Sequence, residues 1–144
     1  MDKKQNLTPS MEDYLESILK METVNSTVKI KDISIDLEVQ MPSVIGALKT
    51  LRSRNLVIYE KNSQIELTKT GKTIALSVKE RHEAIANFLE NVFLFTPEDA
   101  QRTACRIEHV VKPETAKQFR NLTNYIETEV NLPKEEWHSI IQKE

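Results

Sequence analysis

The chain of 144 residues contains only two glycines, Gly46 and Gly71, and a single cysteine, Cys105. Because the loops that cradle nucleotide phosphates need two or more clustered glycines, a dinucleotide site and a P-loop are excluded. A single cysteine cannot form an internal disulfide, which indicates a reducing compartment. No apolar run approaches the ~18 residues of a membrane span, and no signal-peptide core is present. We therefore expect a cytoplasmic protein with no membrane partner.

Charge is nearly balanced overall but unevenly distributed. The formal net charge is −2, yet residues 41–80 hold seven Lys or Arg against three Glu. One basic segment between two acidic flanks is typical of a chain with one element that faces nucleic acid. Ordinary variation over so short a segment is the alternative. The length fits a single domain or two small ones that share a core.

Helix signals dominate the sequence. Amphipathic stripes follow capping residues or prolines at positions 8–9, 42, 96–97, 112–113 and 133, and a long helix is expected from about residue 68. A short helix over 31–37 and the helix that begins at Pro42 are separated by a tight turn. Two β-prone runs, 56–59 and 64–67, flank a turn at 61–63. Helix, helix, helix and hairpin in this order predict a winged helix-turn-helix.

We therefore predict a mainly α-helical fold with one small β-hairpin, divided into two domains. Residues 1–75 form a winged helix-turn-helix DNA-binding domain, and residues 76–144 form a helical domain for metal binding and dimerisation. The four amphipathic helices of the C-terminal half bury little core alone, so we expect a homodimer.

The helix that begins at Pro42 is expected to read double-stranded DNA. Val44, Leu48 and Leu51 form its buried stripe, and Ala47 is assigned to the opposite face. The expected DNA contacts are Pro42, Ser43, Ile45, Gly46 and Lys49, with Arg52 and the wing residue Lys61 on phosphates. Because this set has few hydrogen-bonding side chains, sequence preference should depend on thymine methyl groups, DNA shape and half-site spacing.

A thiol, a carboxylate and an imidazole fall on one stretch of expected helix. Cys105, Glu108 and His109 lie at i, i+3 and i+4, a spacing that puts them on one face, and together they are a transition-metal ligand set. A buried cysteine beside a solvated Glu–His pair is the alternative.

Two other helices carry metal donors. Asp13 and Glu16 are spaced i, i+3 on the first helix, and His82 lies beside the buried stripe of the long helix. A lone histidine in such a place is more often a hydrogen-bonded core residue than a ligand. The sequence alone does not show that the three helices converge.

The sequence resembles the metal-dependent repressors of the diphtheria toxin repressor and manganese transport regulator family, from residue 8 to about 129. The motifs specific to that family are TPSMEDYLESI at 8–18 and CRIEHVV at 105–111. Three more are shared with many winged helices: VQMPSVIGALKTLRSRNLVIYEK at 39–61, LTKTGKTIA at 67–75 and ERHEAIANFL at 80–89. The resemblance is to the short form of the family, without its SH3-like domain.

The resemblance implies a hybrid ligand set: Asp13, Glu16, His82, Cys105, Glu108 and His109. Asp13 follows the manganese branch of the family, whereas Cys105 agrees with the iron branch. Ala86 and Gln101 stand where the iron branch has further ancillary ligands, which argues against a second site of the iron type. A thiolate disfavours Mn²⁺ and carboxylates favour harder ions, so we expect Fe²⁺ first and Mn²⁺ next, with Co²⁺ or Zn²⁺ binding in vitro.

The implied function is a metal-dependent repressor of metal-ion uptake and homeostasis genes, in which the metal bridges the first helix and the dimerisation domain. One rival is a metal-independent winged-helix regulator with Cys105 as a redox or ligand sensor, which leaves Asp13, Glu16 and His82 unexplained. A metalloenzyme is the other rival. No second general acid or base and no oxyanion device accompanies the ligands, so we expect neither an enzyme nor a small organic ligand.

Overall fold

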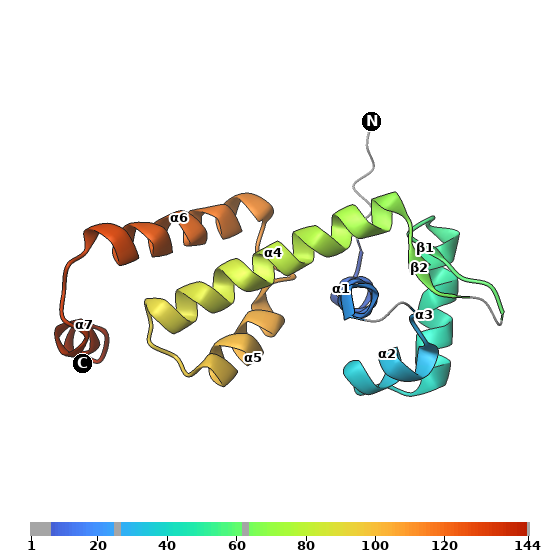
Figure 1. The fold of residues 1–144 in the computed structure, drawn as a ribbon, viewed down its shortest axis with the longest axis horizontal. Helices are drawn as coiled ribbons and strands as arrows, with labels where there is room; N and C mark the ends of the chain where they lie inside the picture. The colour runs from blue at the N-terminus through green and yellow to red at the C-terminus, as the bar shows by residue number, and fades with distance from the viewer. Residues whose placement is uncertain (1–6, 25–26, 62–63, 144) are drawn as a thin grey trace. The chain divides into compact units, whose positions relative to one another are not determined.

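The computed structural model describes residues 7–24, 27–61 and 64–143 and divides into two compact units, Met1–Val78 and Lys79–Glu144 (Figure 1). The first unit contains α1 (Pro9–Val24), α2 (Ile30–Asp36), α3 (Met41–Ser53), β1 (Val57–Ile58) and β2 (Glu66–Leu67). The boundary falls inside α4 (Lys69–Asn91). The second unit continues with α5 (Pro97–Ile107), α6 (Pro113–Glu129) and α7 (Lys134–Ile141).

These elements confirm the predicted fold class, a mainly α-helical chain with one small antiparallel hairpin. The helix starts predicted from proline and capping residues are also confirmed. Thr96, for example, caps α5 by accepting a hydrogen bond from the Asp99 amide at 3.2 Å. None of the helices in the described ranges is long and apolar enough to cross a membrane.

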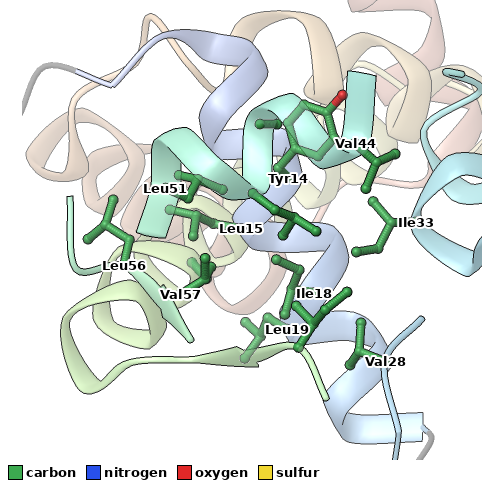
Figure 2. Packing of buried hydrophobic residues seen from close by; sticks show 14 of the residues in the cluster. Tyr14, Leu15, Ile18, Leu19, Val28, Ile33, Val44, Leu51, Leu56 and Val57 are labelled. Atoms are coloured by element: carbon green, nitrogen blue, oxygen red, sulfur yellow. The ribbon is translucent and has the colours of Figure 1, made fainter. Parts of the chain in front are cut away.

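The core of the first unit joins α1, α2, α3 and β1. Figure 2 shows side chains from these elements pointing toward one another, among them Leu15, Ile18, Ile33 and Val44. These four side chains are fully buried. Burial of large aliphatic groups is the main favourable contribution to folding, so this cluster fixes α3 against the rest of the helix-turn-helix.

The hairpin is shorter than predicted. β1 and β2 pair antiparallel with Val57 opposite Leu67 and Ile58 opposite Glu66, two residues on each strand instead of the four expected over 56–59 and 64–67. The Leu56 amide donates to the Leu51 carbonyl at 3.0 Å, which closes the end of α3 and keeps that amide out of the strand ladder. Of the predicted turn at 61–63, residues 62 and 63 lie outside the described residues.

Polar contacts tie α1 to both neighbouring parts of the first unit. The buried Ser17 hydroxyl donates to Asp36 on α2 at 2.7 Å, and Lys20 pairs with the same carboxylate. The Leu67 amide on β2 donates to the Glu22 carboxylate at 2.8 Å. Helix α1, which carries Asp13 and Glu16, is therefore held to the helix-turn-helix and to the hairpin.

The second unit packs α4 against α5 and α6 around a small apolar cluster. Ile85 and Leu89 of α4 meet Ala100 and Ala104 of α5, and Phe119 of α6 packs against them. The two alanines leave α5 close to α4. That closeness is what brings the polar side chains of these helices together.

Candidate metal centre and nucleic-acid interface

Three metal donors converge where α4 meets the end of α5. The ligand atoms of His82, Cys105 and Glu108 all lie within 4.8 Å of one another. His82 Nδ1 is 2.6 Å from Glu108 Oε2 and 3.7 Å from Cys105 Sγ. Imidazole, thiolate and carboxylate together suit a divalent first-row transition metal.

Glu108 is the most unusual member of this cluster because its carboxylate is buried. The residue is 1% exposed, and its Oε1 has no hydrogen-bond partner among the described residues. The imidazole nitrogen His109 Nε2 lies 3.4 Å from Oε1. A buried polar atom without a hydrogen bond is rare and costs about 1–3 kcal/mol, more if it is charged. A bound cation would satisfy this oxygen, so the donor set fits a metal.

His82 is held from both sides of its ring. Its Nδ1 faces Glu108, and its Nε2 lies 2.6 Å from Gln101 Oε1. A neutral imidazole donates through only one nitrogen, so the other nitrogen presents a lone pair. The side chain is 14% exposed, which confirms the predicted position of His82 beside the buried stripe of α4.

The shared face predicted for Cys105, Glu108 and His109 needs one correction. Helix α5 ends at Ile107, and Glu108 keeps helical dihedral angles as the C-cap. His109 lies in the turn that follows, so helical spacing no longer governs its direction. Its side chain still reaches Glu108, by the contact at 3.4 Å.

The alternative of a buried cysteine beside a solvated Glu–His pair is wrong. Cys105 is exposed, whereas Glu108 is fully buried and the His109 side chain is 7% exposed. The thiol is therefore open to a ligand from solvent, while the carboxylate depends on the protein for its partners.

Asp13 and Glu16 lie one turn apart on α1 of the first unit, and both are half-buried. Between them, Tyr14 is buried in the core. Burial and, second, the neighbouring Asp13 carboxylate raise the pKa of the Tyr14 hydroxyl. The structure thus places two half-buried carboxylates one turn apart on α1.

The exposed face of α3 holds most of the residues predicted to contact DNA. Pro42, Ser43, Gly46 and Lys49 are exposed, and Ile45 is half-buried. Arg52 and the wing residue Lys61 are also exposed.

Ala47 was assigned to this DNA face wrongly. Ala47 is only 6% exposed because it follows Val44 by three residues and precedes Leu51 by four, a spacing that puts it on the buried stripe.

A groove of about 800 Å³ runs between the start of α2, α3 and the hairpin. Four cations line it: Lys29, Lys49, Arg52 and Lys61. The described residues of its lining include no acidic side chain. A concave surface with charge of one sign concentrates counter-ions, so this groove favours a polyanion such as a nucleic-acid backbone.

Comparison with known families matches two parts of the chain to two family models. A family model described as the iron-dependent repressor N-terminal DNA-binding domain matches residues 6–65, and one described as the iron-dependent repressor metal-binding and dimerisation domain matches residues 68–139. The chain belongs to the iron-dependent repressor family. This assignment confirms the predicted resemblance and the predicted class, a metal-dependent DNA-binding repressor, and favours it over a metal-independent regulator.

Individual relatives of this repressor include manganese regulators. The HTH-type transcriptional regulator MntR of Bacillus subtilis (strain 168) is 31% identical over 136 residues, 94% of each chain. MntR of Geobacillus kaustophilus (strain HTA426) is 29% identical over 120 residues, 83% of this chain and 84% of the relative. The structure of the manganese regulator SloR matches at 29% identity with a TM-score of 0.72, over 83% of this chain. The repressor spans about half of that solved chain, 55%.

Two cations near the functional surfaces of this repressor were missed in the sequence. Arg81 precedes His82, is 8% exposed and donates to the Val111 carbonyl at 3.1 Å, which ties α4 to the turn after His109. A charged residue beside a polar histidine suggests a solvated face, so the neighbouring sequence gives no sign that Arg81 is buried. Lys29 directly precedes α2 and lines the groove, and the sequence offers little sign of this role, because Lys29 lies in one of the acidic flanks with Lys31 as its one basic neighbour.

Proposed function

We propose that the chain is a cytoplasmic repressor of metal-ion uptake and homeostasis genes and binds double-stranded operator DNA as a homodimer when a divalent metal is bound. The observation that carries the proposal is the buried Glu108 Oε1, which has no hydrogen-bond partner in the described part of the chain and belongs to a carboxylate clustered with His82 and Cys105. This cluster falls in the part matched by the metal-binding and dimerisation model. We propose that the chain has no enzymatic activity. Residues 1–75 would form the DNA-binding domain, and residues 76–144 would form the dimerisation domain.

Six side chains would hold the metal: Asp13, Glu16, His82, Cys105, Glu108 and His109. The clustering of His82, Cys105 and Glu108 in the second unit supports three of them directly. The i, i+3 spacing of Asp13 and Glu16 on α1 suits a carboxylate pair for the same ion. Because a thiolate accompanies the carboxylates, we propose Fe²⁺ as the preferred ion and Mn²⁺ as the next.

The metal ion would supply positive charge that compensates carboxylates from both units. Without that compensation, repulsion among the carboxylates of Asp13, Glu16 and Glu108 would disfavour any arrangement in which both units hold the ion. α1 is tied to α2 through Ser17 and to β2 through Glu22, so the DNA-binding elements follow α1. The proposal is therefore a population shift between two arrangements of the chain, with different affinities for operator DNA.

The DNA would be bound through α3 and the basic groove beside it. An α-helix fits the major groove, and dimers of such modules read half-sites about 34 Å apart. Lys29, Lys49, Arg52 and Lys61 are placed to contact phosphates along the groove, which supports DNA as the polyanion. Pro42, Ser43, Ile45 and Gly46 would face base edges.

The bridging role of α1 is tested by Asp13→Asn. We expect this variant to keep metal binding by the donors of the second unit, weakened about ten-fold or more, and to lose the metal-dependent gain in operator affinity. Metal binding is measured by anaerobic titration calorimetry, and operator binding by fluorescence anisotropy with and without Mn²⁺. Asp32→Asn removes the same charge from α2 of the same unit and should leave the metal dependence intact. The bridging proposal is wrong if Asp13→Asn retains the wild-type ratio of operator affinities.

A further inference from the structure

The chain has only two glycines, and the structure gives a packing reason for one of them. Gly71 lies in the first turn of α4, where an added Cβ would lie 1.9 Å from the carbonyl oxygen of Leu56, the residue before β1. A side chain cannot be accommodated there without moving the backbone. Gly71 is therefore required by the fold itself.

Gly46 has no such reason within the protein. It is the sixth of the thirteen residues of α3 and has no positive φ angle, so a left-handed conformation does not call for glycine. Apart from its two chain neighbours and the local helix backbone, no heavy atom of the described residues lies within 4 Å of a Cβ added at Gly46. A helix is less stable with glycine than with alanine at an interior position, because glycine loses more backbone freedom on folding. The fold alone would thus favour alanine at this position.

The position of Gly46 on α3 is what distinguishes it. Pro42, Gly46, Lys49 and Ser53 recur at i, i+4, i+7 and i+11, so they form one exposed stripe, opposite the buried stripe of Val44, Leu48 and Leu51. Gly46 lies in the middle of the exposed stripe. Helix α3 continues without a break through Gly46 to Ser53, and the Gly46 carbonyl also accepts a hydrogen bond from the Thr50 hydroxyl at 3.2 Å.

We infer that Gly46 is a specificity-determining residue, at which the backbone of α3 approaches the base edges of the DNA major groove most closely. Glycine is the residue that lets a backbone approach a ligand without a Cβ between them. With no side chain at this position, the neighbouring Ser43 and Ile45 reach bases that a bulkier residue would hold away. This inference rests on the proposed function, since it takes DNA as the ligand of α3.

The inference predicts opposite effects of one added methyl group on stability and on specific DNA binding. Gly46→Ala should raise the melting temperature of the full chain by about 3 °C, because alanine is the better helix former. The same variant, loaded with Mn²⁺, should bind its specific site about ten-fold more weakly, because the methyl group moves α3 off the bases. Affinity for a scrambled duplex of equal length should change less than about two-fold, because phosphate contacts dominate non-specific binding.

The experiment starts from a duplex selected out of random sequences by the Mn²⁺-loaded wild-type protein. Affinities of wild type, Gly46→Ala and Gly46→Gln for the selected and scrambled duplexes are measured at one salt concentration, and glutamine should cost more than alanine. Ser53→Thr is the matched control, because it adds one methyl group at the far end of the same exposed stripe and should leave both affinities unchanged.

Three outcomes would overturn the inference. The first is that Gly46→Ala binds the selected duplex as tightly as the wild-type protein does. The second is an equal loss on both duplexes, which would indicate a general defect in DNA binding. The third is that Ser53→Thr loses as much affinity for the selected duplex as Gly46→Ala does. In each case the proposed function is still supported if the wild-type protein needs Mn²⁺ to bind the selected duplex. If the wild-type protein binds that duplex equally well without Mn²⁺, the proposed function itself is contradicted.

Discussion

Glu108→Gln tests the buried carboxylate at the centre of the proposed metal site. Glutamine has the same shape as glutamate, and its amide can still hydrogen-bond with His82. We expect the metal-free variant to stay within about 1 kcal/mol of the wild-type free energy of unfolding, since the buried Oε1 oxygen makes no hydrogen bond with the described residues and already costs the wild-type protein stability. A loss of metal response in this variant would therefore not be a loss of folding.

The size of the expected loss follows from the burial of Glu108. An anionic donor that is 1% exposed is replaced by a neutral one, and we expect the metal dissociation constant to rise by about 100-fold, or about 2.7 kcal/mol. At a metal concentration 100 times the wild-type dissociation constant, binding stabilises the wild-type protein by about 2.7 kcal/mol. For a chain of this length, that raises the melting temperature by about 5–10 °C. At the same concentration the variant gains only about 0.4 kcal/mol, or about 1 °C.

Thermal unfolding with and without Mn²⁺ measures both quantities, and calorimetric titration gives the dissociation constants. Glu83→Gln is the matched control, because Glu83 follows His82 on α4 but is exposed and pairs with Lys79. That variant should keep the full metal-dependent rise in melting temperature. A rise in Glu108→Gln as large as in wild type would refute the assignment of Glu108 as a metal ligand.

Three other properties follow from the same structure. Cys105→Glu should shift metal selectivity toward Mn²⁺, and an unchanged Mn²⁺/Fe²⁺ ratio in anaerobic competition would count against Cys105 as a ligand. Because burial and then Asp13 raise the pKa of Tyr14 above its ordinary value of about 10, the folded state binds the phenol proton more tightly. The free energy of unfolding should therefore fall as the pH rises above about 10, and it should fall less steeply in Tyr14→Phe. Urea unfolding at several pH values measures this, and an equal dependence of the unfolding free energy on pH in both proteins would contradict it. For an operator duplex, log affinity falls with log salt, and Lys49→Ala and Lys61→Ala should each make this negative slope shallower by about 1. An unaltered slope would exclude a phosphate contact by that lysine.

The helix order could be predicted because its signals are local. Threonine or proline at a helix start acts on the first turn only, so Thr96 and Pro113 could be assigned without knowledge of the fold. The length of the hairpin strands depends instead on how the preceding helix ends. The Leu56 amide is taken by Leu51, and the sequence carries no sign of that bond. Ala47 was misassigned because alanine is small enough to suit either face of a helix.

The candidate site was predictable in its residue types but not in its burial. Helical spacing indicated that Cys105 and Glu108 share a face, and the buried stripe of α4 indicated that His82 is not in solvent. The contrast between an exposed thiol and a fully buried carboxylate comes from the packing of α5 against α4, a contact between segments distant in sequence. The burial of Arg81 has the same origin, since Arg81 donates to the carbonyl of Val111, thirty residues later in the chain.

The central claim, that metal binding controls DNA binding, is tested most directly by one titration. The affinity of the full chain for its selected operator duplex is measured in the metal-free state and with Mn²⁺, Co²⁺, Zn²⁺ and, under anaerobic conditions, Fe²⁺, with metal stoichiometry determined on the same samples. We predict that the metal-loaded forms bind at least about ten-fold more tightly than the metal-free form, within the usual range of allosteric coupling. Equal operator affinity with and without bound metal would contradict the account.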